Sequence, residues 1–334
     1  MADWERYKTG LHRVSDKCYA YMQPDGSWGL NNTAFLVSRG ETLMIDTGCD
    51  ITLTDRMLDA IAKAEPAAEK VGTVVLTHWH VDHVHGVNSE RLRNSRIYAS
   101  RICAEWMAKL PPQRWLEAIG SLEGDAKRQI DHLLGKKFDF SGLEYIPPTD
   151  IFEGRAEFTV GGCQVIVVEG KPCHTRSDSL VHIPEEGVVH SGDLISAGKH
   201  VGLQFPFMAH LLELVDLMLS WEAQVYIPGH GPLLNAQDLR DIRTYLVFMQ
   251  SEARRRYDAG MPVEDATDDI LRNLGPYKKL RGAENLLFTI RMLYAEFAGD
   301  TTDHVRRDYP GYLATQWQLK RTVPEKFPEL FARF

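Results

Sequence analysis

The chain has 334 residues, of which 44% are hydrophobic and 25% charged, and its formal net charge at pH 7 is −8. These values are ordinary for a soluble globular protein and allow one large domain or a core domain with an appendage. The negative charge argues against nucleic acid as a partner, because binding to a phosphate backbone depends on clustered lysine and arginine.

The cellular location is predicted from the first residues and from the cysteines. The start, MADWERYKTG, lacks the apolar stretch of a secretory signal, and no window offers about 18 uninterrupted apolar residues, so we expect neither export nor membrane insertion. The five cysteines are odd in number and scattered, without a C-x-x-C pair, which is typical of reduced thiols. We therefore expect a cytoplasmic protein.

The first half of the chain begins with short β-like runs from Gly10 to about Gly48, namely CYAYM, NTAFLV and TLMIDTG. The segment QPDGSWG (23–29) between the first two predicts a hairpin tip with a tight turn. An amphipathic helix is expected next, since Leu53, Met57, Ile61 and Ala64 would share one face. A buried strand, VGTVVLT (71–77), then leads directly into the histidine-rich segment THWHVDHVHG (77–86).

The remaining chain alternates in the same way and then becomes helical. Residues 87–137 are expected to be mostly helical, including an inserted helical segment at about 100–137. A second β-rich half runs from about 156 to 194, and a helix around 210–221 and a strand AQVYI (223–227) follow. Helical spacing of apolar residues beyond Leu234 predicts a helical extension, 235–334, after a catalytic domain at 1–234. Its aromatic-rich end should pack on its own domain or on a second subunit, which would make a homodimer.

The histidine-rich segment has the spacing of a metal site. Residues two apart at the end of a strand project to the same side, so His78 and His80 can share one ion. Asp82 and His83 lie where the chain turns into a helix and can face the same cavity. Further donors are available in PCHTRSDS, HSGDL and PGHGP, each of which follows a β-like run, and functional sites of α/β sheets collect at such strand ends.

The ordered set THWHVDH, CHT, GD and GHG resembles the metallo-β-lactamase-fold superfamily of metal-dependent hydrolases. The resemblance extends over about residues 10–235 and includes IDTG, whose Asp46 occupies an acidic position that these proteins place beneath the site. It implies an α/β fold, a four-layer αββα sandwich, here with a helical C-terminal extension.

The resemblance also implies a ligand set for two divalent ions. His78, His80 and His174 would hold the first ion, Asp82, His83 and His230 the second, and Asp193 would bridge them. We expect Zn²⁺, although such nitrogen and oxygen donors also suit iron and manganese.

Two positions depart from the superfamily pattern. His85-Gly86 stands where Gly-Gly is common, and Cys173 stands where glycine commonly precedes the third histidine. Because seven ligands are already supplied, we expect His85 to support the ligands from behind or to begin a helix, and Cys173 to be buried and not a ligand.

The expected reaction is hydrolysis. Two cations that share a water molecule lower its pKa towards 7, so a metal-bridging hydroxide would attack the substrate, with Asp82 positioning the water or carrying its proton. The expected substrate is a small-molecule carboxyl derivative, namely a lactone, ester, thioester or amide. A phosphoester or sulfate ester is the nearest alternative.

Three other functional classes fit the sequence less well. A di-iron oxidoreductase of this fold would need a flavin-binding module, for which no signal follows. A nuclease would need a basic, aromatic-rich appendage, which the acidic composition does not offer. A metal-free scaffold is disfavoured by the intact ligand set.

A substrate pocket is expected beside the metals. The hairpin tip could lean over the site as a flap, the inserted helices carry aromatic residues, and the loop KHVGLQFPFMAH follows the bridging aspartate. Such a pocket would be mostly apolar with a few polar groups, as small-molecule sites usually are. The candidate residues are Trp28, Trp106, Trp115, Lys199, His200, Phe205, Phe207 and Met208.

Overall fold

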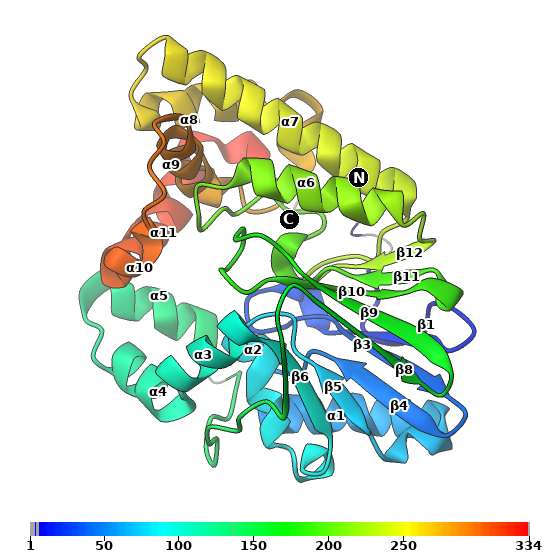
Figure 1. Cartoon of the computed structure of the whole chain (residues 1–334). Coiled ribbons are helices and arrows are strands. Elements are labelled where there is room, and N and C mark those ends of the chain that lie inside the picture. The colour runs from blue at the N-terminus through cyan, green and yellow to red at the C-terminus, as the bar shows by residue number, and fades with distance from the viewer. Residues whose placement is uncertain (1–3, 5–6, 136, 333–334) are drawn as a thin grey trace.

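The computed structural model describes residues 4, 7–135 and 137–332 and places two β-sheets face to face between layers of helices (Figure 1). The first sheet has the strand order β1-β2-β3-β4-β5-β6-β7. Its neighbours are antiparallel from β1 to β4 and parallel from β4 to β7. The strands are β1 (Gly10–Arg13), β2 (Cys18–Met22), β3 (Thr33–Ser38), β4 (Glu41–Ile45), β5 (Thr73–Val75), β6 (Arg96–Ser100) and β7 (Asp150–Phe152).

The second sheet has the order β12-β11-β10-β9-β8. It is antiparallel except for the pair formed by β11 and β12. The strands are β8 (Arg155–Val160), β9 (Cys163–Glu169), β10 (Ser179–Ile183), β11 (Val188–His190) and β12 (Val225–Ile227).

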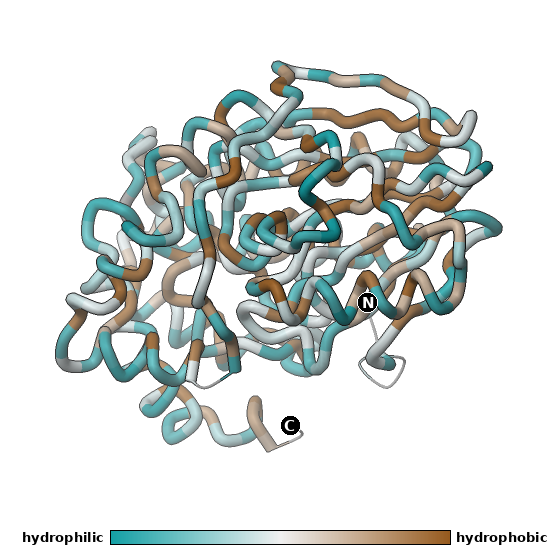
Figure 2. Tube along the Cα trace, turned by 90° about the horizontal axis from the view of Figure 1, so that it is seen from below, coloured by the Kyte–Doolittle hydropathy of each residue, from teal (hydrophilic) through white to brown (hydrophobic). Residues whose placement is uncertain are grey.

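A hydrophobic core joins the two sheets. Alternate residues of β3 and β4, such as Leu36 and Leu43, are fully buried against Val165, Val167 and Val181 of the second sheet. Figure 2 shows that hydrophobic and hydrophilic segments alternate along the trace. Burial of these two inner faces is the main reason why the sheets stack.

Helices cover the outer faces of both sheets. α1 (Ile51–Ala64) lies beneath the first sheet, and α6 (Met208–Ser220) and α7 (Ala236–Asp258) cover the second (Figure 1). The other helices are α2 (Val81–Val84), α3 (Arg101–Lys109), α4 (Pro112–Gly120), α5 (Gly124–Leu134), α8 (Val263–Arg272), α9 (Leu286–Phe297), α10 (His304–Arg307) and α11 (Tyr309–Lys326). The αββα sandwich with C-terminal helices confirms the predicted fold class.

Some elements differ from the expectation drawn from sequence. β6 lies inside the segment 87–137 that was expected to be mostly helical, because a five-residue run such as RIYAS is too short for its periodicity to separate strand from helix. α7 begins after Asn235, whose side chain forms a capping box with Asp238. α11 packs against α5 of the same chain. No helix among the described residues is long and apolar enough to cross a membrane.

Candidate metal centre

The candidate ligands lie on loops that follow strands of both sheets. After β5 the chain passes through Thr77 to His78 and His80, and α2 then begins, carrying Asp82 and His83. The other three ligands come from the second sheet, where they follow β9, β11 and β12; they are His174, Asp193 and His230. The two sheets thus bring together residues that are more than 90 positions apart in the chain.

One group of donors consists of His78, His80, His174 and Asp193, whose ligand atoms all lie within 4.8 Å of one another. Nε2 of His174 is 3.0 Å from Nδ1 of His80 and 3.4 Å from Oδ2 of Asp193. Three imidazoles and one carboxylate at this spacing can surround one cation.

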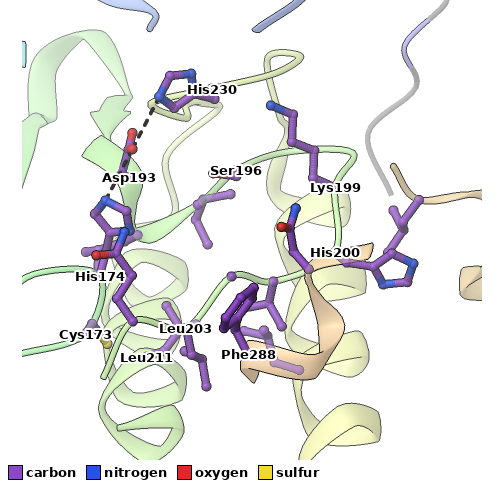
Figure 3. Close-up of a pocket in the computed structure, with 18 of the residues that line it drawn as sticks. Cys173, His174, Asp193, Ser196, Lys199, His200, Leu203, Leu211, His230 and Phe288 are labelled. Atoms are coloured by element: carbon purple, nitrogen blue, oxygen red, sulfur yellow. Dashed lines mark ion pairs between the residues drawn. The ribbon is translucent and has the colours of Figure 1, made fainter. Parts of the chain in front are cut away.

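The second group consists of Asp82, His83 and His230, which are all buried. Nε2 of His230 lies 3.3 Å from Oδ2 of Asp82 and 3.3 Å from Oδ2 of Asp193, while Nε2 of His83 is 3.3 Å from Oδ1 of Asp193. Asp193 therefore touches both groups, and Figure 3 shows its side chain between His174 and His230. This is the position that a bridging carboxylate needs.

The hydrogen bonds around the histidines test whether these residues fit metal ions. The Thr77 hydroxyl donates to Asp46 and so accepts from Nδ1 of His78 at 3.0 Å, while Nδ1 of His83 donates to Asp46 at 2.8 Å. Nδ1 of His230 lies 3.2 Å from the carbonyl oxygen of Leu30. With Nδ1 protonated, Nε2 carries the lone pair. Nε2 of His78 is buried without a hydrogen-bond partner in the described chain, while Nε2 of His83 and Oδ1 of Asp193 face each other at 3.3 Å without the geometry of a hydrogen bond, as expected of atoms that converge on a metal ion.

Asp46 is held in a strained conformation beneath the ligands. Its φ is +60°, in the left-handed region that residues other than glycine rarely adopt, and its side chain is fully buried. It accepts hydrogen bonds from the backbone N–H of Thr77 at 2.7 Å and from its hydroxyl at 2.7 Å, in addition to the bond from His83. The surrounding structure thus maintains a costly backbone conformation in order to aim one carboxylate at two ligand-bearing segments.

The electrostatics of the two groups differ. Burial lowers the pKa of His78 well below its usual value and that of His80 to about 3, so both imidazoles are neutral. Burial also opposes protonation of His230, but Asp193 and Asp82 outweigh it and raise the pKa of His230 to about 9. Burial would raise the pKa of Asp193, yet His230 and His83 hold it well below its usual range. Cations entering this site would compete with the protons on these histidines.

The two positions that depart from the superfamily pattern lie outside both ligand groups. The His85 ring is buried against Trp115 and Phe140, and burial lowers the pKa of His85 to about 4. The Cys173 thiol is buried, lies 3.6 Å from the carbonyl oxygen of Phe207, and has its pKa raised well above the usual value by burial. All five cysteines are free and buried.

A cavity of about 240 Å³ adjoins the ligands (Figure 3). Its wall includes the candidate ligands His174, Asp193 and His230, so a molecule in the cavity would reach the candidate metal centre. The polar lining residues include Ser196, Lys199, His200, Gln204, Asn285 and Gln316. The hydrophobic lining includes Trp28, Leu194, Ile195, Val201, Leu203, Leu211, Ile242, Leu246, Leu280 and Phe288.

Three of the eight pocket candidates line this cavity, namely Trp28, Lys199 and His200. Burial lowers the pKa of Lys199 to about 8 and that of His200 to about 3, and Nδ1 of His200 lies 2.9 Å from the Tyr245 hydroxyl. Trp28 packs edge-on against Phe138.

The other five candidates lie outside this cavity because each packs elsewhere. Trp106 lies against Trp79, and Trp115 lies against His85. Phe205 and Phe207 stack on each other, and Met208 begins α6 and is fully buried beneath it. Aromatic composition alone could not separate cavity walls from ordinary packing.

Several supporting residues were not identified from the sequence. Thr77 links Asp46 to His78, and His190 accepts a hydrogen bond from the Gly192 N–H at 3.1 Å, which fixes the turn before Asp193. Asp178 accepts hydrogen bonds from the Thr175 N–H, which holds the His174 loop. Thr77 directly precedes His78, and this position next to a candidate ligand was the only feature of the sequence that could have indicated its supporting role.

Comparison with known proteins identifies the family of the chain. The sequence model of the Metallo-beta-lactamase superfamily matches residues 26–232, a range that contains all seven candidate ligands. The chain belongs to this superfamily. Membership and the ligand geometry together indicate an enzyme with a metal site and a hydrolytic reaction.

The individual relatives are distant. A linear primary-alkylsulfatase from Pseudomonas sp. (strain ATCC 19151) is 22% identical over 296 residues, which cover 81% of this chain and 53% of the relative. An atrochrysone carboxyl ACP thioesterase from Aspergillus fumigatus is 22% identical over 280 residues, which cover 83% of this chain and 72% of the relative. The chain spans about half the length of the alkylsulfatase.

Two solved structures share the fold. The sec-alkylsulfatase Pisa1 from Pseudomonas sp. has a TM-score of 0.63 at 15% identity, and the match covers 90% of this chain and 52% of the alkylsulfatase chain. A metallo-beta-lactamase from Pontibacter korlensis has a TM-score of 0.53 at 18% identity, and the match covers 72% of this chain and 99% of the lactamase chain. The longer match to the alkylsulfatase includes helices beyond the superfamily domain.

Proposed function

We propose that the protein is a dinuclear metallohydrolase that cleaves a small-molecule carboxyl derivative, namely a lactone, ester, thioester or amide. The observation that carries this proposal is the cavity of about 240 Å³ that opens onto His174, Asp193 and His230 and continues between hydrophobic side chains. A carbonyl group would lie at the ligands while an apolar acyl or alcohol group fills the remaining space.

The chain's own residues prepare the reaction. Bound cations would supply a water molecule of lowered pKa and would polarise the scissile carbonyl. Asp82, whose Oδ2 lies 3.3 Å from Nε2 of His230, would orient that water and take up its proton. A bound substrate that fills the hydrophobic part of the cavity would limit access of bulk water and so strengthen the electrostatic interactions inside.

We propose zinc as the metal, because the donors are five histidine nitrogens and two carboxylates without a thiolate ligand. Iron and manganese accept the same donors. Iron would favour the di-iron oxidoreductase alternative instead of hydrolysis.

Metal content is the first test. Untagged protein produced without added metal should contain about two zinc ions per chain by mass spectrometry, and His174→Ala and Asp193→Ala should each lower this number. The zinc-loaded protein should then hydrolyse 4-nitrophenyl esters or lactones, and both variants should lose this activity. Iron in place of zinc, or no metal even after reconstitution, would overturn the proposal.

A sulfate ester or phosphoester is a second candidate substrate. It is favoured by Lys199, a lining residue whose ammonium group donates to the carbonyl oxygen of Gly26 and could turn to an anionic product, and by the similarity to proteins described as alkylsulfatases. Comparing kcat/KM for 4-nitrophenyl sulfate, 4-nitrophenyl phosphate and 4-nitrophenyl acetate would distinguish the two classes. A rate with either anionic substrate that exceeds the rate with the acetate would favour this second candidate.

The cytoplasmic location and the homodimer remain predictions from the sequence. Size-exclusion chromatography with light scattering would test the homodimer directly. A monomer at micromolar concentration would contradict it.

A further inference from the structure

An arginine from the C-terminal helices lies close to the metal centre of the catalytic domain. Cζ of Arg306 in α10 is 3.4 Å from the ring centroid of Trp106 and 5.2 Å from that of Trp79. Trp79 stands between His78 and His80, and its ring is 4.7 Å from the ring of His80. Because the ring of Trp79 lies 5.2 Å from Cζ of Arg306 and 4.7 Å from the His80 ring, Cζ of Arg306 is within about 10 Å of the His80 ring centroid.

A second arginine comes from the loop of the third histidine. Arg176 lies two residues after His174, and its Cζ is 5.1 Å from the ring centroid of Phe205. Hydrogen bonds from Thr175 and Ser177 tie this loop to itself and to Asp178. His174 lies 3.0 Å from His80, between Nε2 and Nδ1, so the loop of Arg176 meets the segment that carries Trp79 and His80.

Within the described residues neither guanidinium is in direct contact with a carboxylate, although Asp303, which accepts from the backbone N–H of Arg306, acts on it electrostatically. In the part of the chain that the structure describes, no hydrogen bond or ion pair joins the side chain of Arg176 or Arg306 to a carboxylate, although arginines such as Arg96 and Arg243 have one. Each contacts an aromatic ring through cation–π interactions, and these leave N–H groups at the edge of a guanidinium free to donate. Arg306 is exposed and Arg176 is partly exposed, so an anion in solution can reach them.

We propose that Arg176 and Arg306 form a subsite that binds an oxyanion group of the substrate, such as a carboxylate, at the side of the metal centre formed by His80 and His174. The proposal rests on the proposed hydrolase function and deepens it, because it names the substrate class as molecules that carry an anionic group apart from the scissile bond. Arg176 lies two residues after His174, and Arg306 lies on the ring of Trp79 beside His80. Two arginines fixed in this way would set the distance between the oxyanion group and the reacting carbonyl.

Binding of simple carboxylates tests the subsite without requiring hydrolysis. The metal-loaded protein is titrated calorimetrically, at constant ionic strength, with monocarboxylates and dicarboxylates of equal chain length from four to eight carbons. At one chain length the dicarboxylate should bind about tenfold more tightly, because its second carboxylate makes charge-assisted hydrogen bonds. This preference should fall close to unity in Arg306→Gln and Arg176→Gln and be partly kept in Arg306→Lys.

Arg307→Gln is the matched control, since Arg307 is an exposed arginine on the same helix as Arg306. A dicarboxylate preference that is absent, or that persists unchanged in both Arg306→Gln and Arg176→Gln, would overturn the subsite. Circular dichroism of each variant verifies that it is folded.

Steady-state kinetics distinguishes a subsite for the substrate from a site for free anions. The ratio of kcat/KM for the mono-4-nitrophenyl ester of glutaric acid to that for 4-nitrophenyl butyrate should fall about tenfold in Arg306→Gln, mainly through KM. An unchanged ratio, despite altered dicarboxylate binding, would refute a role in substrate binding. If neither ester is cleaved, the proposed hydrolysis of such esters fails, while the carboxylate titration still decides whether the subsite exists.

Discussion

Nδ1 of His83 lies 2.8 Å from Oδ2 of Asp46, and both side chains are completely buried. The same carboxylate accepts two hydrogen bonds from Thr77, which in turn holds Nδ1 of His78. One aspartate therefore fixes the tautomer and orientation of a histidine in each of the two ligand groups. Because Asp46 contributes no ligand atom itself, its effect on metal binding is a direct test of this arrangement.

Asp46→Asn should weaken metal binding while leaving all seven ligands in place. An amide can offer its N–H₂ to His83 and so favour the wrong tautomer, and loss of such a supporting carboxylate typically costs roughly 10–100-fold in metal affinity. Competition with a fluorescent zinc chelator measures the change. Asp16→Asn, at an exposed loop position, is the control. Equal zinc affinity in Asp46→Asn and the wild-type protein would show that Asp46 does not orient the ligands.

Much of the site could be predicted because its chemistry is local in sequence. The segment 77–86 supplies four candidate ligands, and the remaining three follow β-like runs beside glycine, serine or threonine. The supporting contacts could not be predicted in this way. The carbonyl of Leu30 meets His230 at a separation of 200 residues, and Arg306 meets Trp79 only after the C-terminal helices fold back.

The pocket was the least predictable part for a related reason. Trp106, Trp115, Phe205, Phe207 and Met208 have the composition of a pocket wall, but whether an aromatic residue faces a cavity or a neighbouring helix depends on tertiary packing. The short strand β6 was missed because its sheet neighbours, and not its own sequence, determine its conformation.

Cys173→Ala should retain both metal ions. The thiol is buried, burial raises its pKa, and it belongs to neither candidate ligand group, so we expect it not to serve as a thiolate ligand. The small cavity left by the substitution should reduce the free energy of unfolding by about 1 kcal/mol. Metal analysis and urea denaturation measure the two quantities, with His174→Ala as the variant that does lose metal. Loss of one ion from Cys173→Ala would identify the cysteine as a ligand after all.

Lys199 should make stability depend on pH in the alkaline range. Burial lowers its pKa from 10.5 to about 8, so the folded protein pays for holding a charged ammonium group below pH 8. Between pH 8 and 10.5 the unfolded chain binds more protons than the folded chain, and stability from this group rises with pH. The gain in the free energy of unfolding that Lys199→Met brings over the wild-type protein should therefore be larger at pH 7 than at pH 10.

Chemical denaturation of both proteins at the two pH values gives this difference. Lys63→Met, at an exposed position in the last turn of α1, is the control and should show no such change. A stability gap between Lys199→Met and wild type that is the same at pH 7 and pH 10 would contradict the lowered pKa.

Ile242→Trp should shorten the acyl chains that the enzyme accepts. Ile242 lies on α7, lines the cavity beside the ligands and is only half-buried, so a larger side chain can enter the open space without displacing the core. An indole group would occupy a substantial part of about 240 Å³. We expect KM to rise about tenfold for 4-nitrophenyl octanoate and to change much less for the acetate, because one or two methylene groups excluded from an apolar pocket cost about 1–3 kcal/mol. The control is Val247→Trp, because Val247 lies on the same helix but is exposed and does not line the cavity. Equal effects on both esters would mean that the acyl group lies outside this cavity.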